Sequence, residues 1–348
     1  MHANVLGRRA LLGGLRNVCL ASTGHLLVLT LLALEGASSL MASQLSHEKK
    51  GARGCLGVRR VRISPCTTSK AACAGMGSFG TGSRKGMDME RVQVDDVTLI
   101  ASHDYGVRFG FTERTGGVSG APFASLNLGS HVGDDIACVE ENRRRALAAL
   151  GCAGALERLL VPNQVHGDHV AVVRSACADE LERVRSQIAE GADAIVCTAV
   201  DVPVMLCFAD CVPVVLTAPQ GFAVVHSGWK GTYARIAAKA ARVLMAETGC
   251  APEEIRAYIG PHIQGDEYEV SEDLIEKFDA EFGWENAGKT RLLSLSHAIQ
   301  QALVEAGVPD GQIEDLRLST VRENDRFFSY RAENGKTGRH AALAYMTE

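Results

Sequence analysis

Four short apolar segments in the middle of the chain place the strongest constraint on its fold. They are rich in β-branched residues and cover residues 194–197, 204–208, 213–217 and 222–226. Apolar runs of this length between turn-forming residues are typical of buried strands, because helices need ten or more residues. Further strands are expected at 94–101, 107–112, 159–161, 169–173, 257–259 and 316–319. The sequence therefore predicts a fold built on a buried sheet.

Helical patterns occur between these strands, but they do not alternate with them regularly. They cover residues 138–150, 178–190, 233–248 and 292–306. The first has Asp134 or Asp135 as an N-cap and Gly151 after its end, and the third ends before Gly249, where a left-handed C-cap fits. This mixture predicts an α+β (mixed α/β) fold with a mixed sheet, in one domain that spans residues 87–348.

Residues 1–86 have the composition of a targeting presequence and linker. Three arginines precede the apolar run Leu26–Leu34, which is too short to span a membrane, since that requires ~20 residues. No acidic residue occurs from Lys49 to Gly86, as in transit peptides. We expect delivery to a plastid or mitochondrion. If translation instead starts near Met87, we expect a cytoplasmic protein.

The remainder of the chain is acidic, which excludes some classes of partner. The net charge is −5, although the first 86 residues contain only two acids, Glu35 and Glu48. An acidic body is unsuited to a nucleic-acid backbone, and nothing in it suggests a membrane span. The 11 cysteines include no C-x-x-C pair and are scattered, so we interpret most of those in the body as buried apolar residues. Small molecules are the expected ligands.

Cys211 and His226 are the first candidate pair for chemistry. The turn Ala218-Pro219-Gln220-Gly221 has a type I signature, and pairing its ends places Pro213 opposite His226. A register one pair longer would place Cys211 opposite His226 itself. Both registers direct the two side chains to the same face of the sheet, because side chains alternate with period two. The pair is therefore expected to lie within reach of one metal ion.

A third candidate ligand lies in the polar segment NQVHGD. Its His166 is not expected to fill a core, and His169 competes with it three residues later. Three protein ligands leave one tetrahedral position for water or substrate, which is the arrangement of a catalytic zinc site. The prediction is therefore a Zn²⁺ site.

Several motifs resemble, in order along the chain, those of one known family. They are FTERTGGVS (from Phe111), SLNLGSHVGDD, NQVHG, FADCVPV, VHSGWKG, YIGPHI and FFSYR. The chain is similar to the polyphenol oxidase or multicopper "laccase domain" family of purine nucleoside phosphorylases, related to a bacterial peptidoglycan editing factor. The resemblance covers most of residues 95–346.

The resemblance implies a layered α-β-β-α domain, similar to the cytotoxic necrotising factor fold. It implies zinc held by His166, Cys211 and His226, and phosphorolysis of adenosine, inosine and methylthioadenosine with adenosine deaminase activity. The partners would be purine nucleosides and phosphate, with the protein a monomer or small homo-oligomer. Copper is unlikely on sequence grounds, because a laccase needs about ten histidines in His-x-His pairs, and the 11 histidines here include no such pair.

Three other residues in these motifs are candidates for catalytic roles, and each also has a simpler structural interpretation. Arg114 is a candidate to hold phosphate or is a surface loop arginine, and Lys230 offers phosphate a charge or is solvated. Asp210 orients a ligand imidazole or caps a strand.

The substrate-binding candidates also have alternatives. Asn127 bonds the nucleoside or stabilises a turn, and Gln164 is a candidate to orient substrate. Trp229 stacks on a purine or packs in the fold. His262 is a candidate to contact the metal ligands without binding the metal itself.

Two other classes of function fit the same residues. Cys211 and His226 could be the nucleophile and base of a hydrolase that acts on an amide or a peptidoglycan precursor. Alternatively, the domain could bind metal without turnover and regulate another enzyme.

Overall fold

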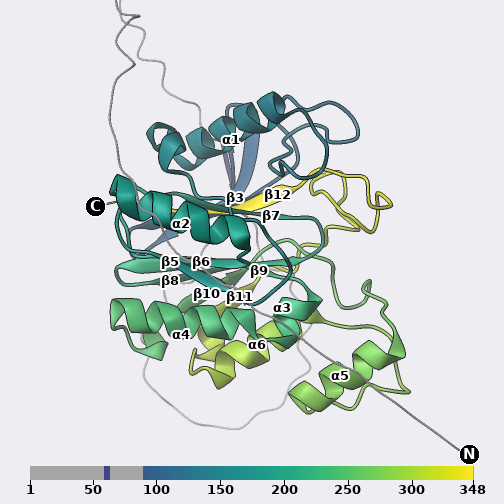
Figure 1. The fold of residues 1–348 in the computed structure, drawn as a ribbon. Helices are drawn as coiled ribbons and strands as arrows, with labels where there is room; N and C mark the ends of the chain where they lie inside the picture. Colours follow the sequence, from purple (N-terminus) through teal and green to yellow (C-terminus); the bar gives the residue numbers. More distant parts are fainter. Residues whose placement is uncertain (1–58, 63–88, 348) are drawn as a thin grey trace, which may run out of the picture. The chain divides into compact units, whose positions relative to one another are not determined.

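The computed structural model describes residues 59–62 and 89–347 (Figure 1). The predicted presequence and linker lie outside the described residues, except for a strand at Arg59–Arg62 (β1), which pairs antiparallel with β2 (Glu90–Val94). No helix among the described residues is long and apolar enough to cross a membrane.

The first sheet has six strands in the order β1-β2-β3-β4-β12-β7, and every neighbouring pair is antiparallel. Its further strands are β3 (Val97–Asp104), β4 (Val107–Thr112), β7 (Val204–Phe208) and β12 (His340–Met346). Strand β12 lies between β4 and the edge strand β7, so the last strand of the domain joins segments from its beginning and its middle.

The second sheet has the order β11-β10-β8-β9-β6-β5 and is mixed, with parallel pairs at its two edges. Its strands are β5 (Val170–Val173), β6 (Ala194–Cys197), β8 (Val212–Ala218), β9 (Gly221–Ser227), β10 (Arg256–Ile259) and β11 (Ile313–Asp315). Strands β6, β8 and β9 are entirely buried, as their apolar sequences predict.

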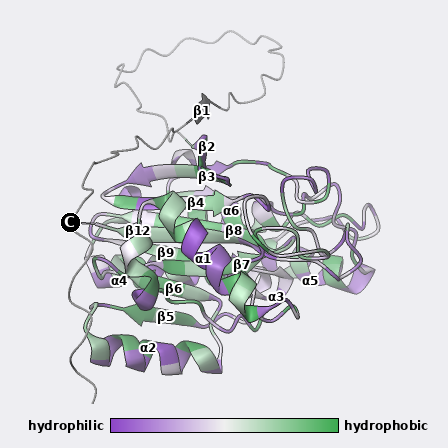
Figure 2. Ribbon diagram, turned by 90° about the horizontal axis from the view of Figure 1, so that it is seen from above, coloured by the Kyte–Doolittle hydropathy of each residue, from purple (hydrophilic) through white to green (hydrophobic). Residues whose placement is uncertain are grey.

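The two sheets pack face to face with helices on their outer faces (Figure 1). Alternate strand residues such as Phe109, Leu206 and Val224 fill the space between the sheets. The opposite residues of the first sheet pack against α1 (Ile136–Leu150), and those of the second pack against α4 (Ile236–Thr248) and α6 (Leu295–Glu305). The helix α2 (Ala178–Glu190) contributes to the core between the sheets. The helix α5 (Glu272–Phe282) contributes to the core on the outer face of the second sheet, with α4 and α6. Figure 2 shows the apolar character of the strands. The predicted α+β fold in a single domain is confirmed; the similarity to the cytotoxic necrotising factor fold stays a prediction.

The helix predictions are mostly confirmed. Helix α1 has Asp135 as its N-cap and Gly151 in the left-handed conformation at its C-cap. The helix predicted at 233–248 is wrong in its first turn, because Arg235 adopts a left-handed φ of 60° and separates α3 (Trp229–Tyr233) from α4. Short 3₁₀ helices form at 153–158, 252–254 and 310–312.

Some strand predictions differ from the structure. The strand expected at 316–319 is wrong, because β10 pairs with β11, which ends before that segment. Within 316–319, Ser319 forms an isolated bridge with His262. The segment at 159–161 contributes a single bridge through Leu160. Strand β12 and helix α5 were not expected at all.

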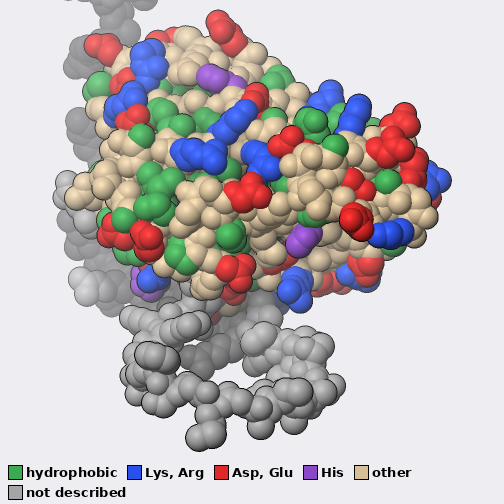
Figure 3. Space-filling model, turned by 90° about the horizontal axis from the view of Figure 1, so that it is seen from below, with side chains coloured by type: hydrophobic (Ala, Val, Ile, Leu, Met, Phe, Trp, Pro, Cys, Tyr) green, Lys and Arg blue, Asp and Glu red, His purple; other side chains and the backbone are tan. Residues whose placement is uncertain are grey.

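Acidic and basic side chains are interspersed on the face of the molecule that lies below in Figure 1, as Figure 3 shows. No extended single-sign area is visible on that face. This pattern agrees with the mixed charge of the body of the sequence.

Candidate metal centre

The β8–β9 hairpin positions the first two candidate ligands. Its register pairs Ala218 with Gly221 and Pro213 with His226, which is the shorter of the two predicted registers. The type I turn prediction is wrong: Gln220 has a φ of 66°, which together with Pro219 fits a type II turn. Since the loop still has two residues, the parity is unchanged, and Cys211 and His226 point to the same side of the sheet.

The third candidate ligand is held by the loop between α1 and β5. The side-chain amide of Gln164 donates to the Cys207 carbonyl and accepts from the Cys207 N–H, both at 2.8 Å. It therefore continues the hydrogen bonding of the edge strand β7 as a backbone segment would. Two residues later, His166 has a φ of 57°, and its ring stands edge-on to the His226 ring at 4.9 Å between centroids.

His166, Cys211 and His226 form one compact group. Their ligand atoms all lie within 4.8 Å of one another, and no other such group of three occurs among the described residues. His226 is buried, Cys211 is half-buried and His166 is exposed. The competing His169 is exposed and bonds to Gln187 instead. A group with one exposed member is reachable by a small molecule from one side.

Asp193 supports this group, although the sequence did not single it out. Its carboxylate is fully buried and accepts from the backbone N–H groups of Val165, His166 and Gly167 at 3.2, 3.0 and 2.7 Å. It also bonds Nδ1 of His226 at 2.7 Å. The imidazole therefore carries its proton on Nδ1 and leaves Nε2 available to a metal. One carboxylate thus fixes both ligand histidines.

The electrostatics of the group favour an ionised thiol. Burial opposes the charge, but His226 and His166 outweigh it and lower the pKa of Cys211 to about 6. Burial also disfavours the His226 cation, but Cys211 and Asp193 raise the pKa of His226 to about 9. A thiolate between two imidazoles is the donor set that zinc takes with one open position.

Gly228 leaves room for this arrangement. A Cβ at this position would lie 3.0 Å from Cδ2 of His166 and 3.2 Å from Sγ of Cys211. The absence of a side chain therefore lets the two ligands approach the backbone after β9 closely. This fit, together with Asp193, is what a built metal site requires.

Arg114 and Asn127 have structural partners where substrate roles were predicted. The guanidinium of Arg114 donates to the carbonyls of Asn324 and Ala124 and pairs with Glu333 at 3.0 Å. It also lies over the ring of Phe328. Because its charge is already neutralised by a carboxylate, the structure does not favour the phosphate role.

The side chain of Asn127 is fully buried and makes four hydrogen bonds. It donates to Asp134 and the Gly129 carbonyl, and it accepts from the N–H groups of Gly129 and Arg339. No donor or acceptor remains for a nucleoside, so the turn-stabilising interpretation fits.

Three further candidates have hydrogen-bond partners other than the predicted ones. Gln164 uses both ends of its amide on Cys207, so it orients the ligand loop and not a substrate. The carboxylate of Asp210 accepts from Thr320 and from the N–H of Arg331, and the bond to His226 comes from Asp193 instead. His262 is buried and bonds the Gly260 carbonyl and Gln264.

Trp229 and Lys230 lie at the start of α3. Trp229 packs partly buried against the core beneath the second sheet, as its simpler interpretation predicts. Lys230 is exposed, and its Nζ lies 5.6 Å from the Trp229 ring centroid. Neither residue has a contact that links it to the ligand group.

The other cysteines of the body are free thiols. Cys152, Cys197 and Cys207 are buried as expected, and burial raises the pKa of the first two to about 12. Cys177 is exposed where α2 begins, so the prediction of burial is wrong there.

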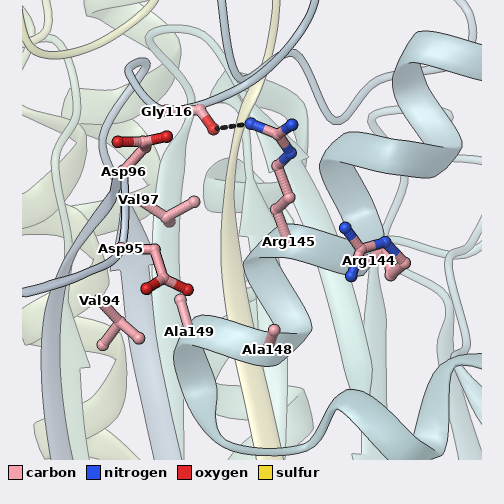
Figure 4. Close-up of a pocket in the computed structure, with 9 residues that line it drawn as sticks. All are labelled: Val94, Asp95, Asp96, Val97, Gly116, Arg144, Arg145, Ala148 and Ala149. Atoms are coloured by element: carbon pink, nitrogen blue, oxygen red, sulfur yellow. Dashed lines mark hydrogen bonds between the residues drawn. The ribbon is translucent and has the colours of Figure 1, made fainter. Parts of the chain in front are cut away.

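Two cavities lie outside the ligand group. The one in Figure 4, about 200 Å³, lies between the β2–β3 turn and α1. Asp96 lies on the side of Arg145, which donates to the Gly116 carbonyl, and Asp95 points toward Ala149. A second cavity, about 490 Å³, has an apolar wall with Arg143 and Arg185 among its lining residues. Neither is lined by His166, Cys211 or His226.

Comparison with known proteins agrees with the family resemblance. Residues 108–347 match the family model described as multi-copper polyphenol oxidoreductase laccase. A purine nucleoside phosphorylase of Deinococcus radiodurans is 38% identical over 254 residues, which cover 71% of this chain and 92% of that protein. The purine nucleoside phosphorylase YlmD of Geobacillus stearothermophilus is 35% identical over 243 residues, covering 67% and 88%.

Solved structures agree with the fold. The crystal structure of YlmD from Geobacillus stearothermophilus has a TM-score of 0.65 at 30% identity, covering 74% of this chain and 98% of that one. The Bacillus licheniformis hypothetical protein YfiH has a TM-score of 0.64 at 32% identity, covering 72% and 97%.

Proposed function

This chain belongs to the multi-copper polyphenol oxidoreductase laccase family, and from that membership we propose that it is a zinc-dependent purine nucleoside phosphorylase. The observation that carries the proposal is the convergence of His166, Cys211 and His226, with Asp193 behind them. Relatives named purine nucleoside phosphorylase match more than two thirds of the chain.

The three ligand side chains limit which metal the site could bind. Two imidazoles and a thiolate suit zinc, and they also occur in blue-copper sites. Oxidase chemistry of the laccase type needs further copper ions held by many more histidines. The sequence contains no His-x-His pair, and the described residues contain one ligand group of three. These observations favour zinc despite the family's name.

The proposed reaction is phosphorolysis of adenosine, inosine or methylthioadenosine. A phosphate oxygen forms a bond to the anomeric carbon of the ribose as the bond to the purine nitrogen breaks. The purine takes the bonding electron pair and the proton of the hydrogen phosphate, which leaves ribose 1-phosphate, or its 5-methylthio analogue when the substrate is methylthioadenosine. When bound, zinc supplies Lewis acidity. The buried hydrogen bond between Asp193 and His226 keeps Nε2 of the imidazole oriented throughout.

Deamination of adenosine is a proposed side activity. Water adds at C6 of the purine and ammonia leaves, giving inosine. The exposed position of His166 at the edge of the group leaves room for a substrate to approach from that side.

A thiol hydrolase is the second candidate, because Cys211, His226 and Asp193 are arranged as a nucleophile, a base and an orienting carboxylate. The lowered pKa of Cys211 fits such a role. His166 distinguishes the two candidates, since a hydrolase has no need of a second imidazole beside the thiolate. Alkylation that inactivates the zinc-loaded protein without releasing zinc would favour the hydrolase.

The test is to incubate the zinc-loaded full chain with adenosine, with and without phosphate, and to follow purines by chromatography. We expect adenine only when phosphate is present, and a small amount of inosine in both cases. Cys211→Ala should lose bound zinc and both products. Cys152→Ala is the matched control, because that buried thiol lies between α1 and the first sheet and should leave both unchanged. Product from Cys211→Ala without bound metal would contradict the zinc role.

A further inference from the structure

Phosphorolysis requires a cationic site for phosphate, and the arginine first predicted for that role is paired with Glu333. Three other basic side chains lie near the ligand group: His131, Arg143 and Arg339, here termed the basic cluster. They come from the loop before α1, from α1 itself, and from the residue before β12.

Backbone pairing places Arg339 beside the segment that leads to Cys211. His340 pairs with Phe208 in the first sheet, and the Phe208 ring lies 5.4 Å from the His226 ring. Cys211 follows Phe208 by three residues. Burial lowers the pKa of Arg339, and the charges of Cys207, Cys211 and Asp210 act against that effect. The pairing of β12 with β7 therefore brings Arg339 to the end of the sheet from which the chain continues to Cys211.

The segment 127–131 joins the three members of the cluster. The N–H of Arg339 donates to Asn127, and the Arg339 carbonyl accepts from the N–H of Leu128. Arg143 donates through Nε and Nη2 to the Leu128 carbonyl at 3.1 and 2.9 Å.

A glycine lets two members of the cluster approach this segment. A Cβ on Gly129 would lie 2.8 Å from Cγ of Arg339 and 3.4 Å from Cε1 of His131. The small residue therefore allows both side chains to pack over the same point, with the Arg143 guanidinium beside it.

The two arginines of the cluster have no ion-pair partner among residues 59–62 and 89–347. Within the described part of the chain, neither Arg143 nor Arg339 forms an ion pair with a carboxylate; Arg339 donates through Nη1 to the carbonyls of Thr337 and Gly338. Partial burial lowers the pKa of His131, and so do the charges of Arg339, Arg143, His166 and His226, in that order. Two guanidinium groups without an ion-pair partner among the described carboxylates, held against the same segment, are suited to bind a phosphate anion.

We propose that Arg339 and Arg143, with His131 packed beside Arg339 at Gly129, bind the inorganic phosphate that attacks the nucleoside. This assignment rests on the proposed phosphorylase function and replaces Arg114 in that role. Arg339 holds the anion on the side of Cys211, and Arg143 neutralises it from α1. A guanidinium presents two parallel donors to phosphate, which fixes the direction of its attacking oxygen.

The kinetic test compares Arg339→Gln and Arg143→Gln with the zinc-loaded full-length wild type. Loss of a charged hydrogen-bond donor should raise KM for phosphate by about 10- to 100-fold. KM for inosine should change by less than about threefold, since the assignment gives the two arginines to phosphate and not to the ribose or base. Arg174→Gln is the matched control: Arg174 is exposed, pairs with Glu247, and should leave both constants unchanged. An unchanged KM for phosphate in both cluster variants, with activity intact, would overturn the assignment.

A binding measurement separates this inference from the proposed function. Titration of inorganic phosphate into the zinc-loaded wild type should give heat of binding that Arg339→Gln loses and Arg174→Gln keeps. That result supports the anion site even if no nucleoside is cleaved, in which case the proposed function alone fails. A wild type that binds no phosphate, or an Arg339→Gln variant that binds it equally well, overturns the inference. Thermal melting identifies any variant that fails to fold, and Arg143→Gln then carries the test.

Discussion

Asp193→Asn should weaken both the fold and the metal site, because one carboxylate holds the ligand loop and orients His226. The aspartate is fully buried and receives four hydrogen bonds, two on each carboxylate oxygen. An asparagine has one oxygen and one NH₂ group. Two of the four N–H groups that now donate to the carboxylate would therefore meet an NH₂ group, which cannot accept a hydrogen bond. Each bond to a charged acceptor contributes about 1.5–3 kcal/mol. The loss of two therefore predicts a destabilisation of about 3–6 kcal/mol for the metal-free protein.

The zinc affinity of Asp193→Asn should also fall. Groups that orient metal ligands typically change affinity by about 10- to 100-fold, and Asp193 orients both ligand histidines. Urea unfolding of the metal-free protein gives the stability, and zinc competition with a chromophoric chelator gives the affinity.

Asp279→Asn is the matched control for this prediction. The Asp279 carboxylate also accepts several hydrogen bonds, from Asn286 and Ala287, but these lie at the end of α5 and touch no ligand. It should lower stability and leave zinc affinity unchanged. The reasoning would be refuted if Asp193→Asn bound zinc within twofold of the wild type, because the carboxylate would then not be orienting the ligands.

Two further predictions concern the ligand group. Gly228→Ala should lower zinc affinity at least about tenfold, since its Cβ would crowd His166 and Cys211; equilibrium dialysis against zinc checks this, and full zinc occupancy at wild-type affinity would show that the ligands tolerate the methyl group. In the metal-free protein, Cys211 should react with iodoacetamide at a rate that rises with pH through about 6 and levels off by pH 7.5, because the thiolate forms above its lowered pKa. Peptide mapping of the alkylated site follows this rate, and a rate still rising through pH 8.5 would mean an ordinary thiol.

The proximity of Cys211 and His226 could be predicted from the sequence because it depends on strand parity. Any two-residue loop between β8 and β9 keeps Cys211 and His226 on one face, so the wrong turn type did not matter. Asp193 was missed because its partners lie 27 and 33 residues away in sequence. A signal was present: an aspartate directly precedes the wholly buried strand β6, where an unpaired charge would be very costly.

The roles of the polar motif residues were harder to predict. Arg114, Asn127 and Gln164 look like ligand-binding residues in sequence. Each instead bonds a backbone group remote in sequence, that of Asn324, Arg339 and Cys207 respectively, and only the tertiary structure provides those partners. Strand β12 was missed because its alanine-rich sequence is buried on both faces and shows no alternation. Helix α5 could have been found, since Ile275, Phe278 and Phe282 recur at helical spacing.

The place of β12 in the first sheet also bears on how the protein folds. Ala342 pairs with Phe111 on one side and Leu206 on the other, so β12 forms contacts with residues that lie more than 130 positions earlier in the chain. Such non-local pairing is slow, because the entropy of a long loop is lost before the contacts form. Until then, β4 and β7 present open edges, which are templates for association with other chains. Slow, concentration-sensitive refolding is thus a consequence of the topology itself, independent of the metal.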